Sequence, residues 1–274
     1  MKPVFALLLC ALAGVNAVLA ENVPLPLPRP PIPAVPHEPH SFAEAVAGLN
    51  FDPTGISAKP TPCDDRLSVM AKFEVKPRLI GPGACGGSDM VLLDAVLLPD
   101  KSRVAIEPPS LLRCEMAESL AAWVRDEVAP RIAKLGSPLR AVQNYDSYEC
   151  RDRNRIQGAK LSEHAKGNAI DVRAFRLADG RRVEPVDVTV DKPLREALRE
   201  SACHRFTTVL GPGEPYHEGH IHLDILERHN GYRICQWAVR EPAPPPVQAE
   251  ATPVPLPLPR PAAAGAPVKH SRNL

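Results

Sequence analysis

Apolar residues recur at helical spacing in two parts of the chain. After Ser110, which can cap a helix, every fourth residue is apolar, and this stripe consists of Leu112, Met116, Leu120, Val124 and Val128. We expect Pro130 to kink or end this helix and Gly136 to stop any continuation. A second helix is predicted to begin after Asp191, with Pro193 in its first turn.

Shorter apolar and alternating runs between turn signals predict strands. Their ranges are 141–145, 168–174, 206–210, 220–226 and 232–236. Because helices and strands are interspersed over the same stretch, the pattern indicates a mixed α+β domain.

The two ends of the chain differ in composition from the middle. Of the 33 prolines, 10 precede residue 60 and 10 follow residue 240, and the octamer VPLPLPRP at 23–30 returns at 254–261. Proline at every second position excludes helix and sheet and leaves polyproline II. Each end is therefore a semi-rigid spacer or a docking peptide for a proline-motif-binding envelope protein. We predict disordered proline-rich segments at 21–58 and 241–274 around one domain at 59–240.

The first twenty residues have the features of an export signal peptide. Lys2 precedes an uncharged, mostly apolar run, and residues 18–20 offer a cleavage site. A membrane anchor is the alternative reading, but the run is short for spanning and contains Asn16. We expect a periplasmic or secreted protein with no membrane span after signal removal.

Cysteine usage agrees with export. One of the seven cysteines lies in the signal, and the even number that remains predicts disulfides. No C-x-x-C pair is present, which disfavours a zinc ribbon or a thioredoxin-like site. Proximity along the chain alone suggests the pairs Cys63–Cys85, Cys114–Cys150 and Cys203–Cys235.

Charge and aromatic content argue against one class of function. Lys and Arg total 33 against 32 Asp and Glu, and aromatic residues make up 4% of the chain. The chain thus has no basic field to attract phosphates and few rings on which bases could stack. We expect no nucleic-acid partner.

Candidate metal ligands gather in two short segments, 162–172 and 217–224. Strand alternation places Asp171 and His222 on polar faces, opposite the apolar neighbours of each. If the two strands are neighbours, His164 converges on the same point. Two imidazoles and one carboxylate are a three-ligand set for Zn²⁺, and the fourth position is left for a water that serves as the nucleophile of hydrolysis.

The first segment resembles a known signature. The motif S-x-H-x-x-G-x-A-x-D of zinc D-alanyl-D-alanine carboxypeptidases and murein endopeptidases is matched by Ser162, His164, Gly167, Ala169 and Asp171. The wider run from about 63 to 235 resembles the bacterial extensin-like C-terminal domain. The pieces that carry this wider resemblance are 147–151, 162–171, 208–213 and 217–224.

The resemblance implies both a fold and a chemistry. The fold is an α+β, zinc D-Ala-D-Ala peptidase-like and disulfide-stapled domain, with a central antiparallel sheet flanked by helices. The chemistry is cleavage of peptide bonds in peptidoglycan stems or crosslinks. One zinc ion per chain would be bound by His164, Asp171 and His222.

The resemblance also assigns catalytic roles. His220 would be a base or a transition-state hydrogen-bond donor, His217 would complete the His-x-x-His-x-His run, and Arg151 would steady the substrate carbonyl. Carboxypeptidase relatives carry an acid three residues before the last zinc histidine, where this chain has Gly219. Glu218 is adjacent, but on a regular strand it points to the opposite face. Either His220 is the base, Glu218 turns in at a bulge, or the metal site persists with weak catalysis.

These observations lead to one main hypothesis and two alternatives. The main hypothesis is an exported zinc-dependent hydrolase of peptidoglycan peptides. The first alternative is a non-catalytic cell-wall-binding or envelope scaffold with a degenerate site, which Gly219 and the repeated octamer favour. The second is a disulfide-stapled domain without metal, which predicts no stoichiometric zinc.

Overall fold

The computed structural model describes residues 49–52 and 60–242. The predicted signal peptide, and all but a few residues of the two predicted proline-rich segments, lie outside these ranges. Asn50–Phe51, which the sequence pattern places in the N-terminal segment, form a short strand, β1.

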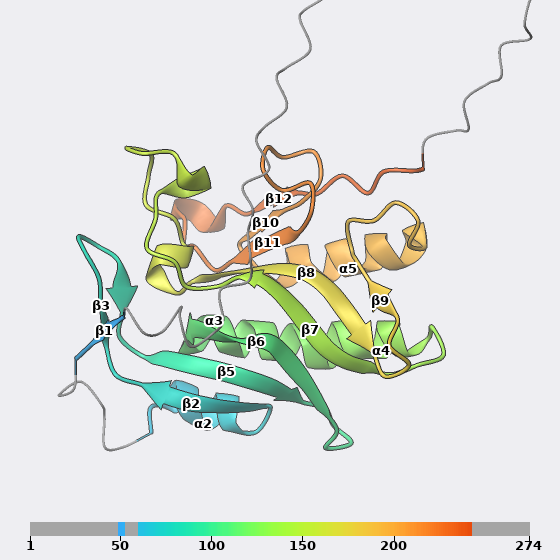
Figure 1. The fold of residues 1–274 in the computed structure, drawn as a ribbon, viewed down its shortest axis with the longest axis horizontal. Helices are drawn as coiled ribbons and strands as arrows, with labels where there is room; N and C mark the ends of the chain where they lie inside the picture. Colours follow the sequence, from blue (N-terminus) through green and yellow to red (C-terminus); the bar gives the residue numbers. More distant parts are fainter. Residues whose placement is uncertain (1–48, 53–59, 243–274) are drawn as a thin grey trace, which may run out of the picture. The chain divides into compact units, whose positions relative to one another are not determined.

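A nine-stranded sheet runs through the described part of the chain (Figure 1). Its strand order is β12-β10-β11-β8-β7-β6-β5-β2, and β9 pairs with β8. Neighbours are antiparallel except for β6–β7 and β10–β12, which are parallel, so the sheet is mixed rather than wholly antiparallel. The strands are Ala71–Lys76 (β2), Met90–Leu97 (β5), Arg103–Arg113 (β6), Leu139–Asp146 (β7), Ala169–Leu177 (β8), Arg182–Val183 (β9), Thr208–Leu210 (β10), Ile221–Asp224 (β11) and Ile234–Gln236 (β12).

The five strands that the sequence pattern predicts are confirmed as β7, β8, β10, β11 and β12, with shifted ends. The prediction missed β2, β5, β6 and β9. Three of these, β6, β5 and β2, form one end of the sheet with β2 at the edge, and β6 is the parallel partner of β7.

Helices cover one face of the sheet and lie behind it in Figure 1. They are Pro62–Ser68 (α2), Cys114–Trp123 (α3), Ala129–Ala133 (α4) and Lys192–Arg205 (α5). The start of α5 is confirmed, because Asp191 accepts a hydrogen bond from the backbone N–H of Leu194. Beneath the helices, Trp123 meets Phe206 edge-on at 5.8 Å between ring centroids, and its indole N–H donates to Ser201.

The prediction that the first helix begins at Ser110 is wrong. Strand β6 continues through Ser110 to Arg113, and Leu112 pairs with Val91 of β5. Helix α3 begins only at Cys114. Leu112 still faces the main core, so the apolar spacing is real, but pairing with a strand that the pattern did not predict decides the boundary.

Pro130 does not end the helix. A π-helical turn, Val124–Val128, joins α3 to α4, and Pro130 lies in the first turn of α4. Because the wider turn already interrupts the regular hydrogen-bond pattern, the missing proline N–H is tolerated there. Gly136, with φ of +86°, follows the last turn as predicted.

A second, three-stranded sheet is formed by β1, β3 (Leu79–Ile80) and β4 (Gly86–Gly87). Leu79 of β3 belongs to a small apolar cluster with Met90 and Leu111, against which Tyr148 packs. Tyr148 lies in the segment that follows β7, so this cluster holds the beginning of that segment in place.

Three disulfides join the described cysteines, and they are Cys63–Cys114, Cys85–Cys150 and Cys203–Cys235. The prediction is right for the last pair and wrong for the other two. Proximity in sequence fails because α2 packs against the start of α3, although the joined cysteines are 51 residues apart.

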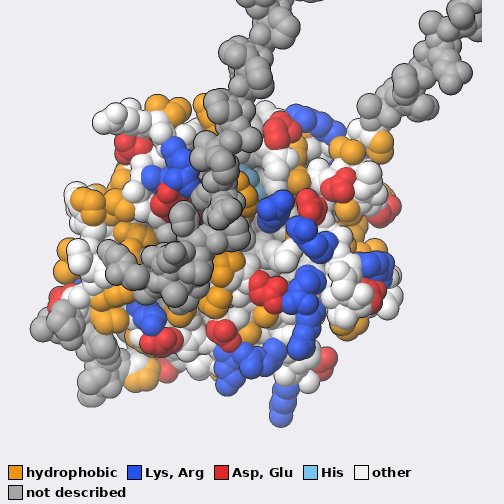
Figure 2. Space-filling model, viewed as in Figure 1, with side chains coloured by type: hydrophobic (Ala, Val, Ile, Leu, Met, Phe, Trp, Pro, Cys, Tyr) orange, Lys and Arg blue, Asp and Glu red, His pale blue; other side chains and the backbone are white. Residues whose placement is uncertain are grey.

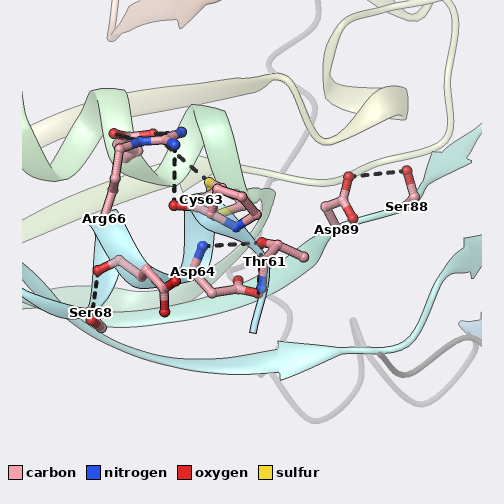
Figure 3. Close-up of a disulfide and its surroundings, with 11 residues drawn as sticks. Thr61, Cys63, Asp64, Arg66, Ser68, Ser88 and Asp89 are labelled. Atoms are coloured by element: carbon pink, nitrogen blue, oxygen red, sulfur yellow. Dashed lines mark hydrogen bonds and ion pairs between the residues drawn. A yellow bond between two sulfur atoms is a disulfide. The ribbon is translucent and has the colours of Figure 1, made fainter. Parts of the chain in front are cut away.

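The junction of α2 with α3 carries further contacts beside its disulfide (Figure 3). Thr61 and Asp64 form a reciprocal cap at the start of α2. Arg66 of the same helix pairs with Glu118 of α3 at 2.7 Å. The disulfide therefore joins two helices that polar contacts already align.

The sheet face opposite the helices carries interspersed basic and acidic side chains (Figure 2). One ion pair on this face joins Arg176 of β8 to Glu107 of β6. Among the helices of residues 60–242, none is both long and apolar enough to cross a bilayer.

Candidate metal centre

Two adjacent strands bring the predicted ligands together. In the antiparallel register of β8 and β11, Asp171 lies directly opposite His222. Their neighbours Ile170 and Val172, and Ile221 and Leu223, are fully buried in the main core. Side chains alternate along a strand, so burial of these apolar neighbours turns Asp171 and His222 to the open face.

The third predicted ligand comes from a tight turn before β8. His164 opens a 3₁₀ turn, His164–Lys166, that ends at Gly167 with φ of +70°. A Cβ on Gly167 would lie 2.9 Å from Met90 Cε and 3.1 Å from the backbone N of Arg113, so the position requires glycine for space as well as for conformation. This turn places the His164 side chain beside Asp171 of β8 and His222 of β11.

The three side chains meet in a triangle of ligand atoms. His164 Nε2 lies 3.2 Å from Asp171 Oδ1 and 3.1 Å from His222 Nδ1, and the latter two atoms are 2.9 Å apart. Ligand atoms about 2.0–2.1 Å from a tetrahedral zinc ion are separated by about 3.3 Å. Three atoms at nearly this spacing can hold one ion.

Outer hydrogen bonds orient the lone pairs of both imidazoles toward the centre of the triangle. His164 Nδ1–H donates to the carbonyl of Ser147 (2.6 Å), and His222 Nε2–H donates to Asp224 (3.2 Å). A carbonyl can only accept, so neutral His164 presents an unprotonated Nε2. In the same way, the carboxylate of Asp224 favours the tautomer of His222 whose Nδ1 is unprotonated. When both imidazoles are neutral, two lone pairs and a carboxylate oxygen point to one position, and this donor set suits Zn²⁺.

The charges of the cluster are strongly coupled. Burial by itself would raise the pKa of Asp171, but the neighbouring His164 and His220 hold that pKa well below its usual range. Burial opposes the charged form of His222, whereas Asp171 and Asp224 raise its pKa to about 9. In the absence of a cation, a proton on His222 offsets the carboxylates, and a metal ion would take over that role.

Two further histidines adjoin the ligands. His220 Nε2 lies 3.4 Å from Asp171 Oδ2, and the His220 ring stacks on Tyr145 at 5.0 Å between centroids. Burial lowers the pKa of His220, so the ring is neutral at neutral pH. The His217 ring lies 5.3 Å from that of His220, and burial lowers its pKa to about 4. Both predicted histidines are thus brought to the cluster, and His220 precedes β11 rather than lying in it.

Arg151 is held beside the cluster by two carboxylates. Its guanidinium pairs with Asp146 at 3.1 Å and with Glu149 at 2.6 Å. Burial raises the pKa of Asp146, and the charge of Asp171 acts in the same direction. Since Asp146 of β7 pairs in register with Asp171 of β8, this network borders the triangle directly.

Glu218 is not brought into the cluster. Its carboxylate pairs with Arg240 at 2.9 Å and accepts a hydrogen bond from the backbone N–H of Gly213. The side chain is 60% exposed. No atom lies within 4 Å of a Cβ built on Gly219, so a side chain there would be accommodated, but this chain provides none.

Several residues of the site were not predicted from the sequence. Asp224 orients His222, Tyr145 stacks on His220, and Asp146 anchors Arg151. The alternation that singled out His222 also placed Asp224 on the same face, so this partner could have been found. The roles of Tyr145 and Asp146 depend on the pairing of β7 with β8, which no local pattern reveals.

Comparison with protein-family models gives a match over the described domain. Residues 61–236, more than half of the chain, match the family model described as "Extensin-like protein C-terminus". No curated protein and no solved structure matches the chain. The matched range contains every residue of the candidate metal centre.

Proposed function

The chain belongs to the extensin-like protein C-terminus family, and from this premise we propose that it is an exported zinc-dependent hydrolase that cleaves peptide bonds of peptidoglycan stems or crosslinks. The observation that carries the proposal is that His164 Nε2, Asp171 Oδ1 and His222 Nδ1 all lie within 3.2 Å of one another. The match of 162–171 to the zinc carboxypeptidase and endopeptidase signature supports the substrate class. A zinc ion bound there would supply a Lewis acid and a water of lowered pKa, the chemistry of metal-assisted hydrolysis.

The protein's own groups around the triangle suit this reaction. His220 is neutral and lies beside Asp171, so it can accept a proton from a nucleophilic water. Stacking on Tyr145 fixes the plane of the His220 ring. In this proposal His220, not Glu218, is the general base, since Glu218 is engaged by Arg240.

Arg151 is suited to hold a substrate carbonyl. Three of its N–H groups point to Asp146, Glu149 and Ser162, and a guanidinium has five. The remaining donors can face an oxygen on which negative charge develops. Because the two carboxylates already fix the guanidinium, little ordering is required when substrate binds.

The proposal is tested by metal content and muropeptide release together. After zinc loading and desalting, elemental analysis should find one zinc per chain in the wild type and none in Asp171→Ala. Incubation with purified sacculi should release muropeptides, chelator should abolish the release, and added zinc should restore it. The matched control is Glu218→Gln, which should equal the wild type in both assays. Muropeptide release that persists in Asp171→Ala would refute the proposal.

One observation favours a second candidate, a non-catalytic wall-binding protein. The position of the carboxypeptidase acid is Gly219, and the adjacent Glu218 is tied to Arg240. A scaffold of this kind would keep zinc and bind sacculi without releasing muropeptides. Co-sedimentation with sacculi of the wild type and of His220→Ala, read beside muropeptide release, separates binding from turnover.

A further inference from the structure

The pairing of β7 with β8 is irregular near the candidate metal centre. Gln143 pairs with Ala174 and Asn144 pairs with Val172, so Arg173 has no register partner on β7. Tyr145 of β7 likewise has no register partner on β8, although its neighbours Asn144 and Asp146 are both paired. An extra residue in one strand of an antiparallel pair is a β-bulge, a device that re-aims a side chain. One such residue, Tyr145, already serves the site by stacking on His220.

Arg173 lies next to the candidate metal centre on the open face. It follows the ligand Asp171 by two residues, a step of about 6.7 Å along a strand. On the other side of β8, the register with β11 pairs Asp171 with His222 and ends at Val172 with Ile221, so Arg173 directly follows the last residue of β8 that pairs with β11. Val172 is buried in the core under the helices, so Arg173 points away from them, and it is exposed.

The guanidinium of Arg173 is not neutralised by a neighbour. The other arginines around it have carboxylate partners, since Arg151 pairs with Asp146, Arg176 with Glu107, and Arg182 with Glu184. Within residues 49–52 and 60–242, the Arg173 guanidinium has no ion-pair or hydrogen-bond partner. A planar guanidinium with five free donors matches the two oxygens of a carboxylate.

We propose that Arg173 binds a carboxylate of the substrate, and that the substrate class is an extended peptide with a carboxylate within about two residues of the bond to be cleaved. An extended peptide advances about 3.3–3.6 Å per residue, so the step from Asp171 to Arg173 corresponds to about two residues. This inference rests on the proposed function and specifies what that site recognises. Arg173 is a binding residue here, distinct from Arg151, whose donors face the reacting carbonyl.

The test compares two probes on four proteins. The probes are a fluorescein-labelled peptidoglycan stem peptide and the same peptide with its carboxylates converted to carboxamides. The zinc-loaded proteins are the wild type, Arg173→Gln, Arg173→Lys and Arg140→Gln. Arg140 is the matched control, because it is also an exposed arginine without a partner in the β7–β8 register. It lies six residues before Asp146 along β7 and is therefore far from the candidate metal centre.

Fluorescence anisotropy reads binding without requiring cleavage. Arg173→Gln should weaken binding of the carboxylate peptide by about 10- to 100-fold, the effect expected for lost charge-assisted hydrogen bonds. Arg173→Lys should recover part of the loss, and Arg140→Gln should equal the wild type. The amidated peptide should bind the wild type and Arg173→Gln equally. If cleavage is measured, KM should rise with little change in kcat.

The outcomes separate this inference from the proposed function. Equal binding of both peptides by the wild type, or equal binding of the carboxylate peptide by the wild type and Arg173→Gln, overturns the role of Arg173. Binding that depends on Arg173 without any cleavage refutes the hydrolase and leaves the recognition intact. Unchanged zinc content and Tm in Arg173→Gln exclude a folding defect.

Discussion

At the scale of single residues, the candidate metal centre depends on the orientation and tautomer of its two histidines. The carbonyl of Ser147 and the carboxylate of Asp224 each take the N–H of a ligand histidine, and the opposite ring nitrogens are left to face Asp171. Without these outer partners, either imidazole could turn or change tautomer. The geometry of the three candidate ligands therefore rests on hydrogen bonds to residues outside the triangle.

Replacing Asp224 should weaken zinc binding without removing any ligand. We expect Asp224→Ala to raise the zinc Kd by about 10- to 100-fold, because His222 loses the acceptor that fixes its tautomer. Competition with a chromogenic chelator measures this Kd. Asp224→Asn keeps an oxygen acceptor and should lie between the alanine variant and the wild type. A Kd unchanged in Asp224→Ala would contradict this account of His222.

Replacing His220 should separate chemistry from metal binding. His220→Gln should retain one zinc per chain and lower kcat by about 10²- to 10⁴-fold, the usual contribution of a general base. Zinc content and the rate of muropeptide release are measured on the same preparation. Glu218→Gln, at a neighbouring position outside the cluster, should leave both quantities unchanged.

At the scale of elements, the segment between β7 and β8 is fastened at several points. Cys85–Cys150 joins it to the turn between β3 and β4, and Tyr148 packs on the small apolar cluster. At its other end, Ser162 Oγ accepts hydrogen bonds from Arg151 and from the backbone N–H of His164. These contacts fix Arg151 and His164 relative to the strands.

Removing this disulfide should cost both stability and function. The double variant Cys85→Ser/Cys150→Ser should lose about 2–5 kcal/mol of unfolding free energy, because the disulfide closes a long loop of the unfolded chain. Denaturant unfolding measures the loss. The control is Cys203→Ser/Cys235→Ser, which should lose comparable stability but retain more turnover under folding conditions, since it lies outside the β7–β8 segment. Equal loss of turnover in both variants would count against this role.

The turn before β8 should tolerate no side chain at Gly167. Gly167→Ala places a Cβ 2.9 Å from Met90 Cε at a φ of +70°. We expect a loss of about 2–4 kcal/mol, from the left-handed backbone and from overpacking together. Gly158→Ala is the matched control, with a φ of +80° but nothing within 4 Å of the added Cβ, and it should lose less. Thermal unfolding of the two variants compares these losses.

At the scale of the whole molecule, the candidate metal centre joins distant parts of the chain. His164 and His222 are 58 residues apart, and β8 with β11 lies in the sheet between the strands β10 and β7. These three side chains are close together only in the folded state, so an ion that they bind would bind the folded state and not the unfolded chain. Metal binding at this centre would therefore add to the stability of the fold.

Zinc should raise the Tm of the wild type in a concentration-dependent way. At a free zinc concentration of about 100 Kd, linkage predicts a gain of about 2.7 kcal/mol in unfolding free energy. Differential scanning calorimetry with and without zinc measures the shift. His222→Ala lacks a ligand and should show no comparable rise, so an equal rise in that variant would place the effect elsewhere.

Helix starts and strand faces could be predicted from a few neighbouring residues, whereas boundaries and disulfides that depend on long-range packing could not. Asp191 and Pro193 mark the start of α5, and the alternation around His222 marks β11, because capping and strand periodicity act over a few residues. Ser110 misleads because its helix signal competes with pairing to β5. The predicted disulfide partner of Cys63 was wrong for a related reason, because distance along the sequence does not reveal that α2 packs against α3.

Local sequence patterns were enough to predict the α+β class, the polar faces of two strands, and the candidate ligands His164, Asp171 and His222. The folded structure was needed to show that these three side chains form a triangle, that Glu218 turns away from it, and that the Arg173 guanidinium is unpaired beside it. The physical reason is that periodicity and capping are encoded in neighbouring residues. Strand order, register and bulges instead arise from the packing of segments far apart in the chain.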